Sequence, residues 1–382
     1  MIIEQIKTDH DLTPLLKKMQ IEGAALKILA AKHQHYLIHI KALHVGAANI
    51  LKQDALSIGA DLAVPKGTII AATPQVDALL IATRKQLQQL SKKELAQPFG
   101  LKEVAQRFSQ ILKAKKTAHC EVMGVINAND DSFFSQSRFK ADAALLKIEK
   151  MIADGATIID IGAVSSRPGA QKVAVSEELA RLRPIVELLS ESDLLSKARF
   201  SIDTFEPEVA AYALEQGFHI VNDISGLRDD RMCEVVAKYH AAVIIMHMQG
   251  TPQTMQADPH YENLLSEVYD FFDTQIKKAE AYGIEEIILD VGIGFGKRLE
   301  DNLSLIQNLE HFLPLRKKLL VGASRKSLIN EIHPSETTQR LSGTLALHLA
   351  AAQNGAAIIR VHDVYEHVQA LKVQETLLQI NC

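Results

Sequence analysis

The sequence predicts a (β/α)8 barrel (a TIM barrel) preceded by a smaller α/β domain, and two observations favour this fold class. From about residue 118 onward, short runs rich in Ile and Val alternate with longer segments of helical period. Near-continuous apolar strands separated by amphipathic helices are typical of a parallel sheet covered on both faces. Eight such runs occupy about 260 residues, close to the length of a typical α/β barrel. An open doubly wound sheet is the alternative, but it usually has fewer strands.

The predicted strands can be followed in order along the chain. They are CEVMGVIN (120–127), TIIDIG (157–162), RFSIDT (199–204), HIVNDIS (219–225), AVIIMHM (242–248), EIILDVGIG (286–294), LLVGASR (319–325) and AAIIRVHD (356–363). The helices between them have start and stop signals. Ser176 heads SEEL, and Pro207 comes early in a segment that stops at Gly217.

Residues 1–115 have a different pattern, and we expect a separate small α/β domain there, with the barrel occupying residues 116–382. Strands are predicted in HYLIHIKAL, GADLAVPKGTII and VDALLIAT. Helices are predicted at roughly 11–31, 45–58, 84–95 and 101–114. This segment contains no metal spacing, nucleophile–base pair or phosphate loop, so its role cannot be read from the sequence.

Composition and charge exclude several classes of protein. The chain has 382 residues, a net charge of −4 and a pI of about 6.4, so no global basic surface indicates a nucleic-acid partner. Cys120, Cys233 and Cys382 are far apart and odd in number, which argues against a disulfide framework or a zinc site and favours a reducing cytoplasm. The N-terminus lacks the pattern of a signal peptide, and no apolar run approaches the ~20 residues of a membrane helix.

Polar side chains follow almost every predicted strand, and in a barrel the active site lies where strands end. Carboxylates and an amide come from the third, fourth and sixth strands, at Asp203, Asn222 and Asp290. Such groups suit a flat, nitrogen-rich heterocycle whose N–H groups donate to carboxylates. Asp160, inside the second strand, is more readily interpreted as a structural hydrogen-bond acceptor.

A second set of strand ends is basic. Arg167 and Lys326 follow the second and seventh strands, and Arg360 and His362 end the eighth, near polar groups at Asn127 and Ser166. Converging cations suit a phosphate or diphosphate, because Arg binds such groups through two parallel hydrogen bonds. A divalent metal on that diphosphate would need few protein ligands, as is usual for Mg²⁺.

These residues lie in segments that resemble the dihydropteroate synthase family, the folate-pathway enzymes that sulfonamides inhibit. The resemblance covers residues from about 120 to 375. Its motifs occur in the family's order and are MGVINANDDSF, GATIIDIGAVSSRPGA, SIDTFEPEVAAYALEQG, VNDISG, IIMHMQGTPQTMQ, LDVGIGFGK, LLVGASRKS, RLSGTLA and IIRVHDV.

The resemblance implies condensation of (7,8-dihydropterin-6-yl)methyl diphosphate with 4-aminobenzoate, giving dihydropteroate and diphosphate. It further implies a cytoplasmic homodimer that acts on small molecules. Carried over position by position, the resemblance implies that the pterin ring is bound by Asp203, Asn222, Asp290 and Lys326, in a slot lined by Met246, Phe295 and Gly322. It implies that the diphosphate is bound by Ser166, Arg360 and His362, and that Asn127 is a ligand of Mg²⁺. The aminobenzoate subsite is implied to include Arg167, Pro168 and Ser327.

The chain departs from the family pattern in its first loop, where Asn129-Asp130 replaces a Thr-Pro pair. Loss of the proline removes a fixed φ and is expected to loosen that loop. Two other functions remain open from the sequence. A pterin-binding methyltransferase barrel would share the Asp and Asn contacts but would not need the basic cluster. A catalytically silent pterin-binding scaffold is supported only by the altered loop.

Overall fold

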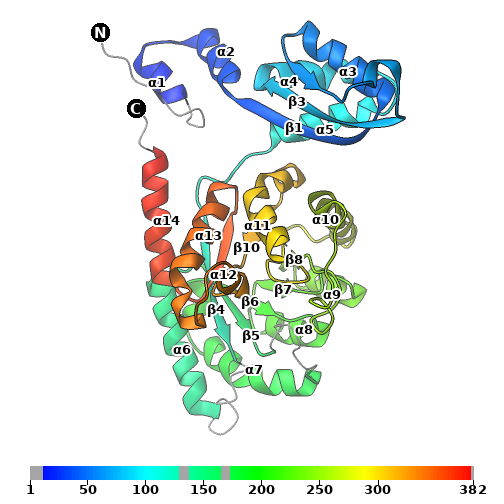
Figure 1. The fold of residues 1–382 in the computed structure, drawn as a ribbon. Coiled ribbons are helices and arrows are strands. Elements are labelled where there is room, and N and C mark those ends of the chain that lie inside the picture. The colour runs from blue at the N-terminus through cyan, green and yellow to red at the C-terminus, as the bar shows by residue number, and fades with distance from the viewer. Residues whose placement is uncertain (1–11, 129–136, 165–172, 380–382) are drawn as a thin grey trace. The chain divides into compact units, whose positions relative to one another are not determined.

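The protein was analysed as a computed structural model that describes residues 12–128, 137–164 and 173–379 (Figure 1). The chain divides into two compact units. One comprises Met1–Ala114 together with Thr376–Cys382, and the other comprises Lys115–Glu375. A small N-terminal domain separate from the barrel is therefore present.

The N-terminal unit is built on an antiparallel sheet in the order β1-β3-β2. The predicted helix at 11–31 is in fact two helices, separated by a turn in which Gln20 has a positive φ of 59°. The elements are α1 (Thr13–Lys18), α2 (Gly23–His33), β1 (His35–His44), α3 (Val45–Ser57), β2 (Asp61–Ala63), η1 (Thr68–Ile70), β3 (Gln75–Thr83), α4 (Arg84–Lys93), η2 (Glu94–Ala96) and α5 (Leu101–Lys113).

The core of this unit follows from strict alternation along β3. Val76, Ala78, Leu80 and Ala82 are buried, whereas the residues between them are not. Because successive side chains of a strand point to opposite faces, only one face of the sheet is covered. The buried side chains pack against the apolar faces of α3, α4 and α5 in a hydrophobic cluster drawn entirely from residues 43–112.

The second unit is a closed parallel barrel in the order β10-β11-β4-β5-β6-β7-β8-β9, and all eight predicted strands are confirmed (Figure 1). The strands are β4 (Glu121–Asn127), β5 (Ile158–Gly162), β6 (Arg199–Asp203), β7 (Ile220–Asp223), β8 (Ala242–Met246), β9 (Ile287–Asp290), β10 (Lys318–Val321) and β11 (Ile358–Val361). The sixth predicted run extends beyond its strand, because the glycines after Asp290 adopt positive φ and turn the chain.

Helices follow the strands and surround the barrel. In chain order the helical elements are α6 (Ser137–Ala153), α7 (Val175–Ser190), η4 (Leu194–Ser196), α8 (Pro207–Glu215), α9 (Asp230–Lys238), α10 (Leu264–Ala281), α11 (Leu299–Gln307), η5 (Leu309–Leu315), α12 (Ser327–Ile332), η6 (Thr337–Gln339), α13 (Leu341–Gln353) and α14 (Val364–Gln379). Pro207 occupies the first turn of α8, as the sequence indicated.

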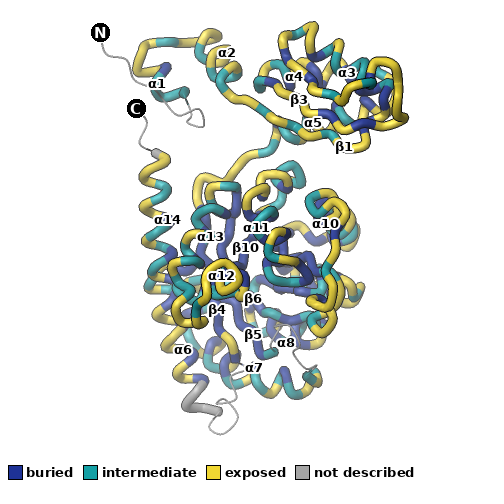
Figure 2. The backbone as a smooth tube through the Cα atoms, viewed as in Figure 1, coloured by how far each residue is buried: buried dark blue, intermediate teal, exposed yellow. Residues whose placement is uncertain are grey.

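The barrel has an inner and an outer apolar layer, and Figure 2 shows its strands as the buried centre of the unit. The inner layer, which includes Met123, Ile220 and Leu320, fills the interior. The outer layer joins the other faces of the strands to the helices, with fully buried rings such as Phe200 and Phe272. A packed interior leaves the strand ends as the place for a binding site.

The register of the barrel brings particular strand ends to the same level. Asp203 lies opposite Asn222 on the neighbouring strand, and Met246 lies opposite Asp290. Asn127 is at the level of Gly162, which is itself opposite Asp203. Side chains that are far apart in the sequence therefore meet at one end of the barrel.

Candidate active site

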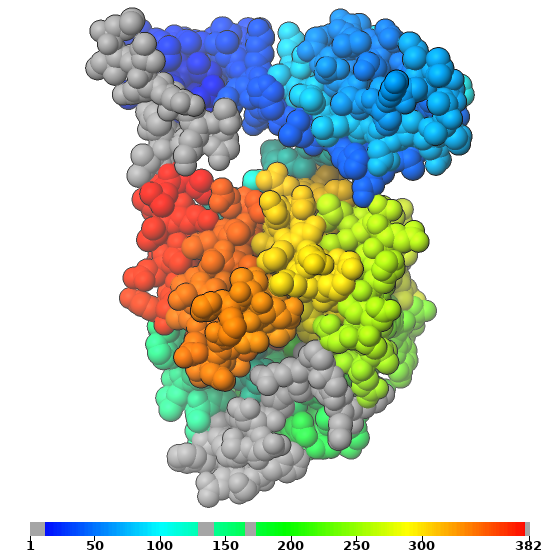
Figure 3. All heavy atoms as spheres, viewed as in Figure 1, coloured from blue at the N-terminus to red at the C-terminus, as the bar shows by residue number. Residues whose placement is uncertain are grey.

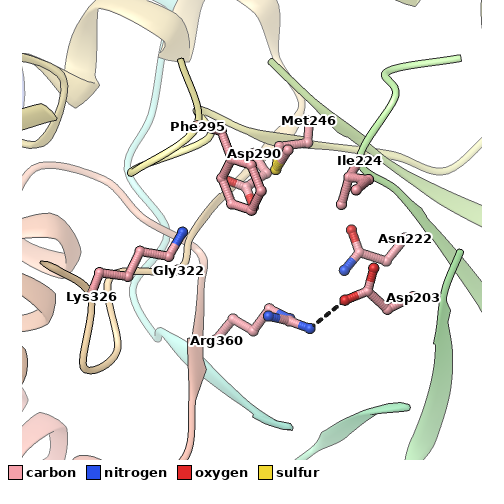
Figure 4. Close-up of a pocket in the computed structure, with 9 residues that line it drawn as sticks. All are labelled: Asp203, Asn222, Ile224, Met246, Asp290, Phe295, Gly322, Lys326 and Arg360. Atoms are coloured by element: carbon pink, nitrogen blue, oxygen red, sulfur yellow. Dashed lines mark hydrogen bonds and ion pairs between the residues drawn. The ribbon is translucent and has the colours of Figure 1, made fainter. Parts of the chain in front are cut away.

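A pocket opens at the carboxyl ends of the barrel strands, and Figure 4 shows the side chains that converge on it. It encloses about 300 Å³ of empty space, part of which is open to solvent. Its lining residues are Asp203, Asn222, Ile224, Met246, Asp290, Phe295, Gly322, Lys326 and Arg360. Six of the eight strands, β6 to β11, supply these residues from their ends or from the loops that follow.

A buried ionic network fixes one side of the pocket. The guanidinium of Arg360 donates from Nε to Asp160 Oδ2 (2.6 Å) and from Nη2 to Asp203 Oδ2 (2.6 Å). Asn222 Nδ2 donates to the same oxygen of Asp160 at 3.1 Å. Asp160 is fully buried, so it holds both Arg360 and Asn222 in place. The sequence interpretation of Asp160 as a structural acceptor describes these contacts, but it did not reveal that the partners are site residues.

Burial changes the acid–base properties of this network. It raises the pKa of Asp203 to about 7, and Arg360 opposes that rise. Burial alone would lower the pKa of Arg360, but Asp160 and Asp203 together raise it above its usual range. The guanidinium is therefore a permanent cation, and its charge favours the ionised form of Asp203 against the effect of burial.

Asp290 and Lys326 face each other across the pocket. Asp290 Oδ1 accepts a hydrogen bond from the backbone N–H of Gly292 at 2.8 Å, and burial raises the pKa of this carboxyl. The ammonium of Lys326 donates to the carbonyl of Ile293 and lies 4.4 Å from the ring centroid of Phe295. Burial lowers the pKa of Lys326 to about 8, and Asp290 opposes that change.

Another lysine shapes the loop after β9. Lys297 is buried, and its ammonium donates to the carbonyls of His247 (3.1 Å), Gly292 (3.0 Å) and Phe295 (3.0 Å). Burial lowers the pKa of this ammonium to about 7. Lys297 thus ties the β9 loop to the end of β8 and fixes where Phe295 enters the pocket. Sequence reasoning missed Lys297, since a lysine after a glycine-rich loop usually indicates an exposed side chain.

The wall beside the carboxylates is apolar. Ile224 and Met246 belong to a small buried cluster with Met248 and Met255, and Phe295 packs against it. The sequence predicted Met246 and Phe295 as lining residues, and both line the pocket. Ile224 was missed because an isolated Ile after a strand gives no functional signal. The result is a slot with a flat aromatic side and a polar edge.

The loops after β10 and β11 are bonded to each other. Ser324 Oγ lies 2.9 Å from His362 Nδ1 and accepts from the His362 backbone N–H at 3.2 Å. Arg325 donates to the carboxylate of Asp363, with Nε 2.9 Å from Oδ2. Burial, followed by the nearby charge of Arg360, lowers the pKa of His362 to about 4. In the free protein, the ring of His362 is therefore neutral at pH 7.

The predicted site residues fall into three groups. Those that line the pocket are Asp203, Asn222, Met246, Asp290, Phe295, Gly322, Lys326 and Arg360. Those that lie nearby without lining it are Asn127 at the end of β4, His362 after β11 and Ser327 at the start of α12. Ser166, Arg167 and Pro168 lie outside the described residues, as do Asn129 and Asp130 of the first loop.

The chemistry of the pocket favours a ligand rich in N–H donors. The buried carboxylates of Asp160 and Asp290 and the partly buried carboxylate of Asp203 lie in a region with two pocket cations, Lys326 and Arg360. In addition, Asn222 Oδ1 is buried and has no hydrogen-bond partner within the described part of the chain. Leaving a buried acceptor unpaired is costly, so a bound group that donates to it is stabilised. A flat heterocycle lying against Phe295 and Met246 could supply such donors.

A metal would find few protein ligands here. Among the described residues, no three His, Cys, Asp or Glu side chains are grouped so that they could hold a metal ion. Asn127 is exposed at the end of its strand and could contribute one amide oxygen. That donor fits a hard cation such as Mg²⁺, which retains several waters and takes its other ligands from substrate phosphates.

The sequence and the fold both match known proteins. Residues 123–362 match the family described as "Pterin binding enzyme". The bifunctional dihydropteroate synthase/dihydropteroate reductase of Helicobacter pylori is 43% identical over 99% of both chains. The dihydropteroate synthase of Escherichia coli is 43% identical over 68% of this chain and 93% of its own.

A solved structure agrees with these matches. It is the dihydropteroate synthase of Thermus thermophilus in complex with 4-aminobenzoate, which covers 68% of this chain and 95% of its own at 39% identity, with a TM-score of 0.60. The chain therefore belongs to the pterin-binding enzyme family. Within that family it belongs with the dihydropteroate synthases, which are transferases of folate biosynthesis.

No helix in the described ranges is long and apolar enough to cross a membrane.

Proposed function

We propose that the barrel condenses (7,8-dihydropterin-6-yl)methyl diphosphate with 4-aminobenzoate through the pocket described above. The observation that supports this proposal best is that one pocket with an aromatic wall brings acceptors and cations together. The acceptors are Asp203, Asn222 and Asp290, and the cations are Lys326 and Arg360. Acceptors on one side and cations on the other suit a substrate that is a nitrogen heterocycle at one end and a diphosphate at the other.

The pterin ring lies in the pocket against the apolar wall formed by Phe295 and Met246. Its amino and ring N–H groups donate to the carboxylates of Asp203 and Asp290 and to the free amide oxygen of Asn222. Lys326 lies at the edge of the ring, where it can donate to a ring nitrogen or carbonyl. The contacts of Asp160 with Asn222 and Arg360 support this arrangement, because they fix two of these groups before substrate binds.

The diphosphate lies toward Arg360 and His362. Arg360 provides a permanent charge that does not depend on pH in the working range. Because the pKa of His362 lies near 4, this ring acts at first as a neutral hydrogen-bond donor, and the arriving diphosphate favours its protonation. Ser166 and Arg167 are proposed to contribute from the second loop, with Pro168 and Ser327 beside the aminobenzoate.

Asn127 is proposed to hold Mg²⁺ through its amide oxygen. A bound Mg²⁺ would neutralise charge on the diphosphate as it leaves. The remaining groups act on the organic substrate and bind, orient and shield it from water.

In the reaction, the C–O bond between the pterin methylene and the diphosphate breaks, and the diphosphate leaves with the electron pair. The amine nitrogen of 4-aminobenzoate forms a C–N bond to the same carbon and then loses one proton to solvent or to the diphosphate. Positive charge develops on the pterin methylene as the bond breaks. The carboxylates of Asp203 and Asp290 stabilise that charge electrostatically, and no strong general base is needed.

The test is product formation by the full chain. We expect purified protein with Mg²⁺ to convert the two substrates to 7,8-dihydropteroate, identified by mass. Arg360→Lys keeps a charge but loses the paired contacts to Asp160 and Asp203, so it should retain the fold and lose most of the rate. A wild-type protein that binds the pterin without forming product would overturn the proposal.

A second activity is supported by the match over the whole chain. The Helicobacter pylori relative, which is named as both a synthase and a dihydropteroate reductase, matches the N-terminal unit as well as the barrel. We propose that this chain also reduces dihydropteroate, with hydride supplied by a reduced nicotinamide or reduced flavin and a proton from solvent. Oxidation of the reductant must depend on dihydropteroate and give equimolar tetrahydropteroate. Absence of that reaction with both classes of reductant would leave the synthase as the single activity.

The assembly and the cellular location also remain proposals. The family resemblance suggests a homodimer, and the free, buried thiols of Cys120 and Cys233 suit a reducing cytoplasm. Light scattering on the purified protein should give twice the chain mass of 42.1 kDa. A mass equal to that of one chain would contradict the dimer.

A further inference from the structure

One face of α13 holds the backbone of the loop that carries Lys326. His348 Nε2 accepts from the Ala323 N–H (2.9 Å), and Thr344 Oγ1 accepts from the Arg325 N–H (3.0 Å). Arg340, which caps the helix, donates from Nη1 to the Arg325 carbonyl (3.1 Å). These three side chains are four residues apart, so they share one side of the helix.

Helix α13 forms part of the orange surface in Figure 3, whereas the contact side chains Thr344 and His348 lie on its buried side. Thr344 is fully buried, and His348 is 1% exposed. Arg325, at the centre of the held loop, has a φ of +57°, a conformation that non-glycine residues rarely adopt. The loop therefore has its geometry imposed by the helix behind it.

Two buried histidines extend this contact to the next loop. His348 Nδ1 lies 2.9 Å from His367 Nε2, and His367 Nδ1 lies 2.5 Å from the carbonyl oxygen of Asp363. His367, on α14, is also 1% exposed. A continuous chain of hydrogen bonds thus runs from the Ala323 N–H after β10 to the Asp363 carbonyl after β11.

The ends of this chain determine where the protons lie. A backbone N–H can only donate, and a backbone carbonyl can only accept. His348 must therefore accept at Nε2 and donate from Nδ1, and His367 must do the same. Both rings are then neutral and carry their proton on Nδ1. A cationic ring would place an N–H against another N–H donor and break the chain.

The surrounding charges act in the same direction. Burial is the largest cause that lowers the pKa of His348, and the neighbouring His367, Lys326 and His362 act in the same direction. Asp363 and Glu366 lie near His367, but burial outweighs them and lowers the pKa of its ring as well. The pair therefore stays neutral at neutral pH.

We propose that His348 and His367 are positioning residues of the active site, which set the spacing between the Lys326 loop and the His362 loop. This inference rests on the proposed function, because it assigns the two loops to the pterin and the diphosphate. The histidine chain lies behind the two bonds that already join these loops, Ser324–His362 and Arg325–Asp363. It acts on substrate only through the two loops, which carry Lys326 and His362.

The first test reads the tautomers directly. In full-length protein labelled with ¹⁵N-histidine, two rings should show a protonated Nδ1 and an unprotonated Nε2. Their signals should stay those of neutral rings from pH 8 down to about pH 6, near the ordinary pKa of histidine. These two signals are assigned by their loss in His348→Gln and His367→Gln. Nε2–H tautomers, or a cationic ring at pH 7, would overturn the proposal whether or not the protein is a synthase.

The second test uses a matched pair of variants. In His348→Gln, the side-chain oxygen reaches the position of Nε2 and can still accept from the Ala323 N–H, whereas in His348→Asn it is too short. We expect kcat/KM for the dihydropterin diphosphate to fall about tenfold or more in His348→Asn, because a buried N–H loses its acceptor. His348→Gln should remain within about threefold of wild type.

A third histidine provides the control. His219 Nδ1 also accepts from a backbone N–H, that of Phe200 at 3.1 Å, but it precedes β7 at the amino end of the barrel. His219→Leu should lower the melting temperature and leave kcat/KM unchanged. Equal losses of kcat/KM in His348→Gln and His348→Asn would contradict a positioning role for His348 and His367 and leave them a structural role. If wild-type protein forms no dihydropteroate, the proposed function fails, and calorimetry of pterin binding replaces kcat/KM as the readout for the same variants.

Discussion

At the level of single residues, the pocket depends on groups whose ionisation is set by burial. Lys326 is an example, because desolvation lowers the pKa of its ammonium to about 8 while Asp290 opposes that change. The charge that meets the substrate is therefore present at pH 7 and is lost as the pH rises through about 8. Substrate binding should favour the charged form.

The first prediction concerns this ionisation. Since kcat/KM reports the free enzyme, it should fall as the pH rises through about 8. Lys326→Arg should be slower at every pH, but it should lack this decline because a guanidinium stays protonated. Initial rates from pH 6 to 9.5 check this, with the melting temperature as control. An unchanged decline in Lys326→Arg would assign the titration to another group.

The second prediction concerns the acceptors. Asp290→Asn should weaken binding of the dihydropterin by about 1.4 kcal/mol or more, a factor of ten, because a carboxylate acceptor is lost. Asp223→Asn is the matched control. Asp223 is also buried and also accepts from backbone N–H groups, those of Ser225 and Leu227, but it does not line the pocket. Calorimetry showing equal affinities for the two variants would remove Asp290 from the ligand site.

Much of the site could be predicted because barrels place function at strand ends. Asp203, Asn222 and Asp290 lie in the carboxyl-terminal parts of apolar runs predicted as strands, Lys326 directly follows such a run, and all four line the pocket. Asp160 differs, because a side chain in the middle of an apolar run gives no sign of which neighbours it will hold. Its contacts with Asn222 and Arg360 depend on strand pairing, which the sequence does not specify residue by residue.

At the level of elements, the loop after β9 and the helices α13 and α14 decide how the site is held. The β9 loop turns on glycines with positive φ and is fixed by Lys297. Histidines on the two helices tie the β10 and β11 loops together. These contacts could not be predicted, because a histidine within a helix is usually a surface or core residue and its partners come from distant segments.

The third prediction tests the β9 loop with two glycines. Both Gly292 and Gly283 have positive φ, at 67° and 82°. A Cβ on Gly292 would lie 2.0 Å from the carbonyl oxygen of His247, whereas one on Gly283 would meet nothing within 4 Å. Gly283→Ala should lower the free energy of unfolding by about 1 kcal/mol, because alanine is strained at a positive φ. Gly292→Ala should cost several times more, or shift the loop and abolish pterin binding. Denaturant unfolding measures the loss of unfolding free energy in both variants. Equal losses in Gly292→Ala and Gly283→Ala would contradict the expected steric clash at Gly292.

At the level of the whole molecule, each of the two units has its own hydrophobic core. The core of the N-terminal unit is drawn from residues 43–112, and that of the barrel from residues 120–371. The fold class could be predicted from periodicity alone, because eight apolar runs alternating with helical segments leave few other arrangements. The role of the N-terminal unit could not be predicted, since it shows no recognisable catalytic pattern.

The fourth prediction separates the units. Residues 115–382 should fold and form dihydropteroate at a rate close to that of the full chain. The Escherichia coli relative supports this expectation, because 93% of its length is matched by 68% of this chain. Any reduction of dihydropteroate should be lost in this truncated protein. If the truncated protein is insoluble, the N-terminal unit is needed for folding of the barrel.

The fifth prediction is the most direct test of the proposed chemistry. Diphosphate release from the dihydropterin diphosphate is measured with Mg²⁺, in the presence and absence of 4-aminobenzoate, for wild type and Lys326→Ala. The pocket geometry predicts release that depends on 4-aminobenzoate, is matched by equimolar dihydropteroate and is abolished in the variant. Tight pterin binding by wild type with no release in either condition would show that the barrel binds its substrate without acting as a synthase.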